Sequence, residues 1–222
     1  MSKHHRVATL IGGLAAALLL CQAALAGPPL ICHPFVTGTA PLLPWVENVN
    51  NWFSPDRHYR IENLTTDTLR LLTPDAPVIA RMENLRRATL YASIDPTAGT
   101  DLLRAIVARI GESAEPRART LASFDAAYLI ETYRQVVHVG KTDLLAEFAA
   151  RATPAAAARV ANLDTQALLR EAQAAAPDLA ADFEFAAYLM SDAASTAAQH
   201  RERAAAGAPA GSLLARNLAH WN

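Results

Sequence analysis

Helix-start signals recur through most of this sequence, and they restrict the fold more than any other feature. From residue 65 onward, Thr or Ser repeatedly precedes a stretch with helical spacing, and proline often takes the first helical position, as in Thr73-Pro74 and Thr153-Pro154. No stretch alternates apolar and polar residues over the length of a strand. The sequence therefore predicts an all-α domain over residues 65–222.

Residues 74–93 show helical spacing most clearly. Apolar positions recur there at intervals of three and four, as a single buried stripe on a helix requires: Val78, Met82, Leu85, Thr89 and Ala92. Arg81, Arg86 and Arg87 fall outside this stripe. The pattern therefore predicts a helix that is buried along one side, with these arginines on its other faces.

Further helices are expected along the rest of the chain, at 100–110, 120–137, 154–162, 165–176, 177–206 and 212–220. Thr100 is the expected cap of the first of them, and Gly111 and Gly140 are suited to end the first two. Short internal echoes have unequal offsets, which does not fit the fixed period of a solenoid. We therefore predict an irregular bundle, or a degenerate helical-hairpin array, of about seven to nine helices.

Residues 27–64 form a separate unit in the sequence. The prolines between residues 27 and 44 rule out a helix and favour an extended backbone: Pro28, Pro29, Pro34, Pro41 and Pro44. This Pro-rich extended arm also holds apolar residues such as Phe35 and Leu43, so we expect it to lie along the surface of the domain or of a partner. Residues 45–64 mix aromatic residues with turn formers and predict a short helix with an irregular connection.

Residues 1–26 have the pattern of a bacterial-type secretory signal peptide. Lys3 and Arg6 precede an apolar run over residues 7–20, and Ala24-Leu25-Ala26 has small residues at the two positions that a signal peptidase accepts. We expect cleavage between Ala26 and Gly27, which leaves a mature protein in the periplasm or outside the cell. The alternatives are an uncleaved membrane anchor over residues 7–26 and lipid attachment at Cys21.

Cleavage at this point also fixes the charge of the mature chain. Of the 20 basic residues, Lys3 and Arg6 are removed, so 18 remain against 21 acidic residues, a net charge of −3. A nucleic-acid partner needs a basic face, and this balance argues against one. With the apolar run removed, the mature form is not expected to span a membrane.

Cys32 and His33 are the residues most suited to bind a metal. They lie close to the predicted mature N-terminus, and a thiolate with imidazoles, among them that of His58, suits copper or haem iron. A covalent haem motif would need a cysteine where Pro29 stands. We therefore expect no cofactor, with copper or haem as the alternative. Otherwise Cys32 is a buried apolar side chain, or it links two molecules in an oligomer.

No catalytic motif occurs in the sequence. Gly140-Lys141-Thr142 lacks the glycine that a phosphate loop needs five positions before Gly140, where Gln135 stands, so Gly140 reads as a helix stop and Thr142 as the next cap. Nucleophile elbows and metal-binding histidine pairs are absent as well. An enzyme assembled from separate helices remains an alternative, with Glu131, Tyr133 and Asp182 as candidate site residues.

These observations favour a non-enzymatic function. The first hypothesis is an exported helical domain that binds a protein or peptide partner through helical grooves and the Pro-rich arm. The second is a metal- or haem-binding exported protein that uses Cys32 and His33, with His58 as a further ligand. The third is the enzyme without a local motif.

Overall fold

The computed structural model describes residues 30–46 and 53–220, so the signal-peptide prediction for residues 1–26 lies outside them. Within these residues the chain forms helices and no strand, which confirms the predicted all-α class. The α-helices are α2 (Leu64–Leu71), α3 (Val78–Ala92), α4 (Pro96–Glu112), α5 (Pro116–Val136), α6 (Leu144–Arg151), α7 (Pro154–Ala161), α8 (Thr165–Ala175), α9 (Ala180–Met190), α10 (Ala194–Gly207) and α11 (Leu213–His220).

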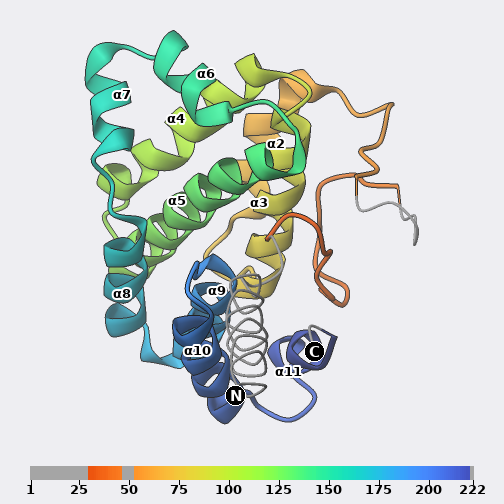
Figure 1. Ribbon diagram of the computed structural model, residues 1–222, viewed down its shortest axis with the longest axis vertical. Coiled ribbons are helices and arrows are strands. Elements are labelled where there is room, and N and C mark those ends of the chain that lie inside the picture. Colours follow the sequence, from red (N-terminus) through yellow and green to blue (C-terminus); the bar gives the residue numbers. More distant parts are fainter. Residues whose placement is uncertain (1–29, 47–52, 221–222) are drawn as a thin grey trace, which may run out of the picture.

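The helices pack as an irregular bundle around α3 and α5 (Figure 1). α5 contacts α3, α4 and α8, while α6 and α7 extend the bundle beyond α4. α9 and α10 lie against each other as a close pair, and α11 contacts both of them. The core is continuous from the arm to α11, because buried side chains of both belong to the same apolar cluster.

Two helices begin four residues earlier than the sequence predicts. α4 begins at Pro96, where the Asp95 side chain accepts hydrogen bonds from the backbone N–H groups of Thr97 and Ala98. α5 begins at Pro116 in the same way, with Glu115 as its cap. An acid followed by proline is an efficient helix start, since the acid accepts free N–H groups and proline has none to satisfy. The expected cap Thr100 instead lies inside α4 and donates its hydroxyl to the Pro96 carbonyl.

Two further helix boundaries differ from the prediction. Residues 73–76 form a turn closed by a 3.1 Å hydrogen bond from Ala76 N to Thr73 O, so α3 begins only at Val78. The helix expected over 177–206 is interrupted, because Ser191 and Ala193 have extended backbones that separate α9 from α10. The break lets the exposed α10 fold back on α9, whose apolar side chains are buried in the bundle.

The one-sided burial predicted for α3 is wrong. The side chains of Arg81 and Arg86 are fully buried, and every residue of α3 except Arg87 is buried. Arg81 donates to both carboxylate oxygens of Asp125 on α5, at 2.9 and 2.7 Å, and Arg86 donates to both oxygens of Glu83 at 2.8 Å. α3 is covered by neighbours on all sides, and buried charges persist there because each guanidinium has a carboxylate partner.

Gly99 marks a close approach of α4 to α3. A Cβ added at Gly99 would lie 2.9 Å from the Cβ of Ala92, closer than real Cβ atoms come. We therefore expect Gly99→Ala to lower the free energy of unfolding by about 1–3 kcal/mol in urea denaturation. A Cβ added at Gly111, in the last turn of α4, would meet only Arg159 Nη2, at an ordinary contact distance of 3.9 Å, so Gly111→Ala should raise the free energy of unfolding by up to about 1 kcal/mol. Equal effects of the two substitutions would contradict this account.

Candidate functional site

The arm, residues 30–46, packs into the helical bundle. Leu30, Ile31 and Leu43 are almost completely buried, and Phe35 meets the ring of Phe185 edge-on with ring centroids 6.1 Å apart. Val36 and Gly38 are exposed, whereas Thr37 between them is buried. The arm is therefore part of the core rather than a loose tail.

Polar side chains of α3 and α11 hold the backbone of this arm. The Asn84 side chain accepts a hydrogen bond from Leu43 N at 2.9 Å and donates one to the Pro41 carbonyl at 3.2 Å. Asn217 on α11 does the same with Val36, through bonds of 2.9 and 2.8 Å to its N–H and carbonyl. A side-chain amide has an acceptor oxygen and two donor hydrogens. It can therefore bind the N–H and carbonyl groups of a peptide backbone whatever side chains the bound segment carries.

Charged residues of α3 complete this contact, together with Tyr91, whose hydroxyl donates to the Pro44 carbonyl at 2.6 Å. We call the whole set the arm clamp and define it as Glu83, Asn84, Arg86, Arg87 and Tyr91 of α3 with Asn217 of α11. Glu83 accepts from Phe35 N at 3.1 Å, and Arg87 donates to the Leu43 carbonyl at 2.6 Å. Arg86 donates to the Ile31 carbonyl at 3.1 Å. The two guanidinium groups also face the Trp45 ring, at 5.4 and 5.8 Å from its centroid.

Glu83 makes the arm clamp sensitive to acid. Burial alone would raise the pKa of Glu83, but the guanidinium groups of Arg86 and Arg87 outweigh burial and hold the pKa below its ordinary value. Ionised Glu83 therefore stabilises the folded state fully above about pH 4.3, which is the ordinary pKa of a glutamate in the unfolded chain. This stabilisation is lost as the pH falls through the lower pKa that Glu83 has in the folded state.

We expect Glu83→Gln to be less stable than the wild type at pH 7 but to lose less stability on acidification to pH 3. The free energy of unfolding, measured in urea at both pH values, checks this. Glu147→Gln is the control, because Glu147 is more exposed and forms an ordinary helix-surface pair with Arg151 at 3.0 Å. The same acid dependence in the Glu83 and Glu147 variants would contradict the role of Glu83.

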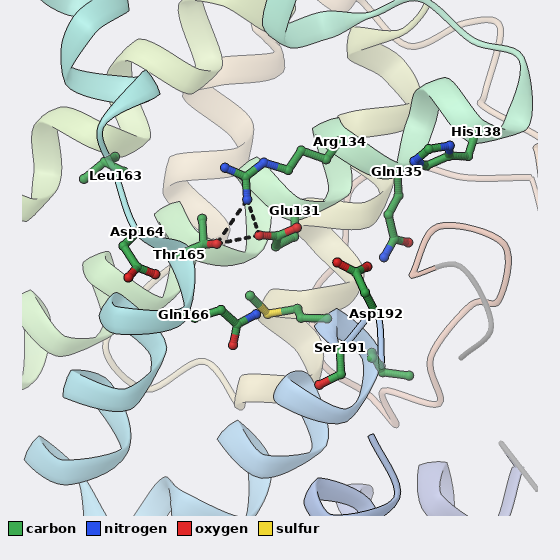
Figure 2. Close-up of a pocket in the computed structure, with 12 residues that line it drawn as sticks. Glu131, Arg134, Gln135, His138, Leu163, Asp164, Thr165, Gln166, Ser191 and Asp192 are labelled. Carbon is green, nitrogen blue, oxygen red and sulfur yellow. Dashed lines mark hydrogen bonds and ion pairs between the residues drawn. The ribbon is translucent and has the colours of Figure 1, made fainter. Parts of the chain in front are cut away.

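A polar cleft of about 660 Å³ opens between α5, the start of α8 and the α9–α10 connection (Figure 2). Its volume lies within the range of about 300–1,000 Å³ that is usual for ligand sites. Three separate segments supply its lining: Glu131, Arg134, Gln135 and His138; Leu163, Asp164, Thr165 and Gln166; and Leu189, Met190, Ser191 and Asp192.

One wall of the polar cleft is held rigidly by hydrogen bonds. Glu131 accepts from both Arg134 and Thr165, and Arg134 also donates to the Thr165 hydroxyl at 3.2 Å (Figure 2). These bonds join α5 to the first residue of α8. Gln135 accepts from Leu30 N, so the arm reaches the bundle beside the cleft.

The rest of the polar cleft has free hydrogen-bonding capacity. Among the described residues, none bonds to the Gln166 amide or to the Asp192 carboxylate. Asp164 is occupied as the cap of α8, where its side chain accepts from Ala167 N at 2.9 Å. Since Arg134 balances Glu131, the unpaired Asp192 gives the cleft a negative character.

The predicted metal ligands do not form a cluster. Within residues 30–46 and 53–220, no three His, Cys, Asp or Glu side chains are placed to hold one metal ion. Burial raises the pKa of the half-buried Cys32 thiol, which the nearby Arg86 only partly offsets. Burial, His220 and Arg86 lower the pKa of His33, and His58 lies exposed in the turn after residue 55. Copper or haem binding thus stays a prediction, which elemental analysis and an absorbance spectrum test.

The three residues suggested for an enzyme are separated. Glu131 lines the polar cleft, but Tyr133 is buried and donates its hydroxyl to the Gly99 carbonyl at 3.0 Å. Asp182 lies in the first turn of α9, outside the lining residues, and burial raises its pKa to about 6. The structure therefore brings one of the three into the candidate site.

Comparisons with protein-family models, curated proteins and solved structures find no match for this chain. Its function must be inferred from the chemistry of the polar cleft and the arm clamp. In the part of the chain that the structure describes, no helix has the length and apolarity needed to cross a membrane.

Sequence reasoning missed the amides that bind backbone, Asn84, Asn217 and Gln135. It also missed Gln166, whose amide lines the polar cleft. Asn84 carried a usable signal, because asparagine is a poor helix former yet stands inside a strong helical pattern. Asn217 stands inside the last predicted helix in the same way. In this chain, both of these asparagines inside predicted helices bind the backbone of the arm.

Proposed function

We propose that this chain is an exported, non-enzymatic domain that binds an extended peptide segment of a partner protein in the polar cleft. The arm clamp is the observation that carries the proposal. In it, Asn84 and Asn217 each bind a backbone N–H and a backbone carbonyl of an extended chain. The polar cleft is lined by two further side-chain amides, those of Gln135 and Gln166, which have the same donor and acceptor groups.

An all-α domain must bind an extended peptide through side chains. The described residues offer no strand edge to which a peptide could add as a further strand. Side-chain amides serve instead, because each has both donor and acceptor groups. Gln135 already accepts from one arm N–H, and the Gln166 amide has no partner among the described residues. A bound peptide would therefore use the Gln166 amide, on the opposite side of the cleft from α5, which carries Gln135.

The charge of the polar cleft favours a basic residue in the peptide. Glu131 is balanced by Arg134, and the Asp164 carboxylate lies 3.9 Å from Arg170. Asp192 is left without a described partner. A lysine or arginine side chain beside Asp192 would gain about as much as a partly exposed ion pair, up to about 1 kcal/mol.

Two pools of fluorescein-labelled, C-amidated dodecapeptides test this proposal by fluorescence anisotropy with residues 27–222. Both pools are random except at the sixth position, which is Arg in one pool and Glu in the other. We expect saturable binding of the Arg pool and binding of the Glu pool weaker by about threefold or more. Asp192→Asn should reduce this preference, and Gln166→Ala should weaken the binding of both pools.

The control for these variants is Asp101→Asn, which removes a charge on the exposed face of α4 and should leave both affinities unchanged. Failure of both pools to bind would contradict the proposal, and so would unchanged binding by the Asp192 and Gln166 variants. The export part of the proposal is tested separately by mass spectrometry of the protein from its native host. The expected first residue is Gly27, whereas an intact Met1 or a lipid on Cys21 would overturn the predicted cleavage.

A further inference from the structure

A second cleft, of about 600 Å³, lies between the arm, the α2–α3 turn and α11. It is lined by residues 37–41 of the arm and by these residues of the helical bundle: Arg70, Leu71, Thr73, Asp75, Ala76, Pro77, Ala80, Leu213 and Arg216. The second cleft shares no lining residue with the arm clamp or with the polar cleft, although the arm clamp holds the same arm. Its chemistry is therefore a separate question from the proposed peptide binding.

The floor of the second cleft is apolar. The side chains that form it share small or aliphatic character: Pro41, Leu71, Ala76, Pro77, Ala80 and Leu213. The arm shapes the rim through a turn at Gly38, whose φ of +64° is strained for residues with a side chain. A Cβ at this glycine would lie 3.6 Å from Leu213 and 4.0 Å from the Arg216 guanidinium. The apolar floor suits an apolar chain, while Thr37, Thr39 and Thr73 add hydroxyl groups to the lining.

Two arginines stand at the edge of this floor. Arg216 is exposed, and no described residue pairs with its guanidinium. Arg70 lies 2.7 Å from Asp67, but this bond uses only one of its five N–H groups. Asp75 is the one acid among the lining residues. A guanidinium beside an apolar surface suits a carboxylate, which it can bind through two parallel hydrogen bonds.

We infer that the second cleft binds an apolar chain that ends in a carboxylate, with Arg216 as the carboxylate partner and the apolar floor as the site of the chain. Two sources supply this chemistry, a free fatty acid and the C-terminus of a peptide with apolar last residues. Arg70 adds positive charge on the same side of the cleft. This class of ligand is inferred because the Arg216 guanidinium, which no described residue pairs with, lies beside the apolar floor.

Isothermal titration calorimetry of residues 27–222 tests this inference with four probes. Octanoate and acetyl-Ala-Leu-Leu with a free C-terminus carry the carboxylate, while octanol and the C-terminal amide of the same peptide lack it. We expect at least one carboxylate probe to bind about tenfold more tightly than its uncharged counterpart. The tighter of the two carboxylates identifies the source.

Arg216→Gln provides the matched variant, because Arg216 is exposed and its loss should leave the circular dichroism spectrum unchanged. The variant should bind octanol as the wild type does and lose the preference for the carboxylate probes. Arg104→Gln, on the exposed face of α4, is the control and should retain that preference. The inference is overturned if neither carboxylate binds, if octanol and octanoate bind equally, or if Arg216→Gln keeps the preference.

Discussion

Replacing Asp125 by alanine is expected to lower the free energy of unfolding by about 3–5 kcal/mol, a large part of the stability of a domain of this size. Asp125 is fully buried and accepts from Arg81 at 2.9 and 2.7 Å and from Arg109 at 3.2 Å. Without it, the buried Arg81 guanidinium keeps only backbone carbonyls as partners. Urea denaturation followed by circular dichroism at 222 nm, the usual helix signal, measures the loss.

Two further variants separate charge from packing in this experiment. Asp101→Ala removes an exposed partner of Arg104 and should change stability by less than about 1 kcal/mol. The double variant Arg81→Met/Asp125→Leu replaces the buried pair with apolar side chains and should recover most of the loss. A loss below about 1 kcal/mol in Asp125→Ala would show that the pair does not hold α3 to α5.

Phe35→Ala is the second substitution with a large expected effect, about 3–5 kcal/mol of the free energy of unfolding. The Phe35 ring is 6% exposed and packs edge-on against Phe185 of α9, so its removal leaves a cavity between the arm and the bundle. The same urea denaturation measures this loss. Hydrogen exchange should also show that the Leu43 amide, which Asn84 binds, opens more often.

The neighbouring residue provides the control for Phe35. Val36 has an exposed side chain, and alanine keeps the backbone groups that Asn217 binds, so Val36→Ala should change stability by less than about 0.5 kcal/mol. Similar losses for the two variants would mean that the buried Phe35 ring contributes no more to stability than the exposed Val36 side chain, which would contradict this account. No loss for Phe35→Ala would mean that the arm is not part of the core.

The helical class could be predicted because its signals are local. The Thr153 side chain accepts from Ala156 N as expected for a helix cap, and Gly140 ends its helical segment with a φ of +74°. Caps and helix stops depend on residues within one helical turn of each other, and these residues are adjacent in the sequence. The prediction of Thr142 as the cap of the next helix is wrong, because the Asp143 side chain caps α6 by accepting from Ala146 N.

The buried charges and the polar cleft could not be predicted in the same way. Arg81 looks like a surface residue until Asp125, 44 positions later, is placed beside it by the packing of α3 on α5. Likewise Glu131 meets Thr165 only because α8 packs on α5, and Asp192 joins them through the break between α9 and α10. The sequence pattern does not indicate which residues from distant parts of the chain come into contact.

The central claim, that the polar cleft binds an extended peptide with a basic residue, is tested most directly by a nuclear magnetic resonance titration. The ¹⁵N-labelled residues 27–222 would be titrated with the unlabelled dodecapeptide pool that has Arg at its sixth position. The account predicts saturable shifts for the amides of residues 163–166 and 189–192, with α4 and α7 unaffected. Shifts that are absent, or that arise only outside these two segments, would contradict it.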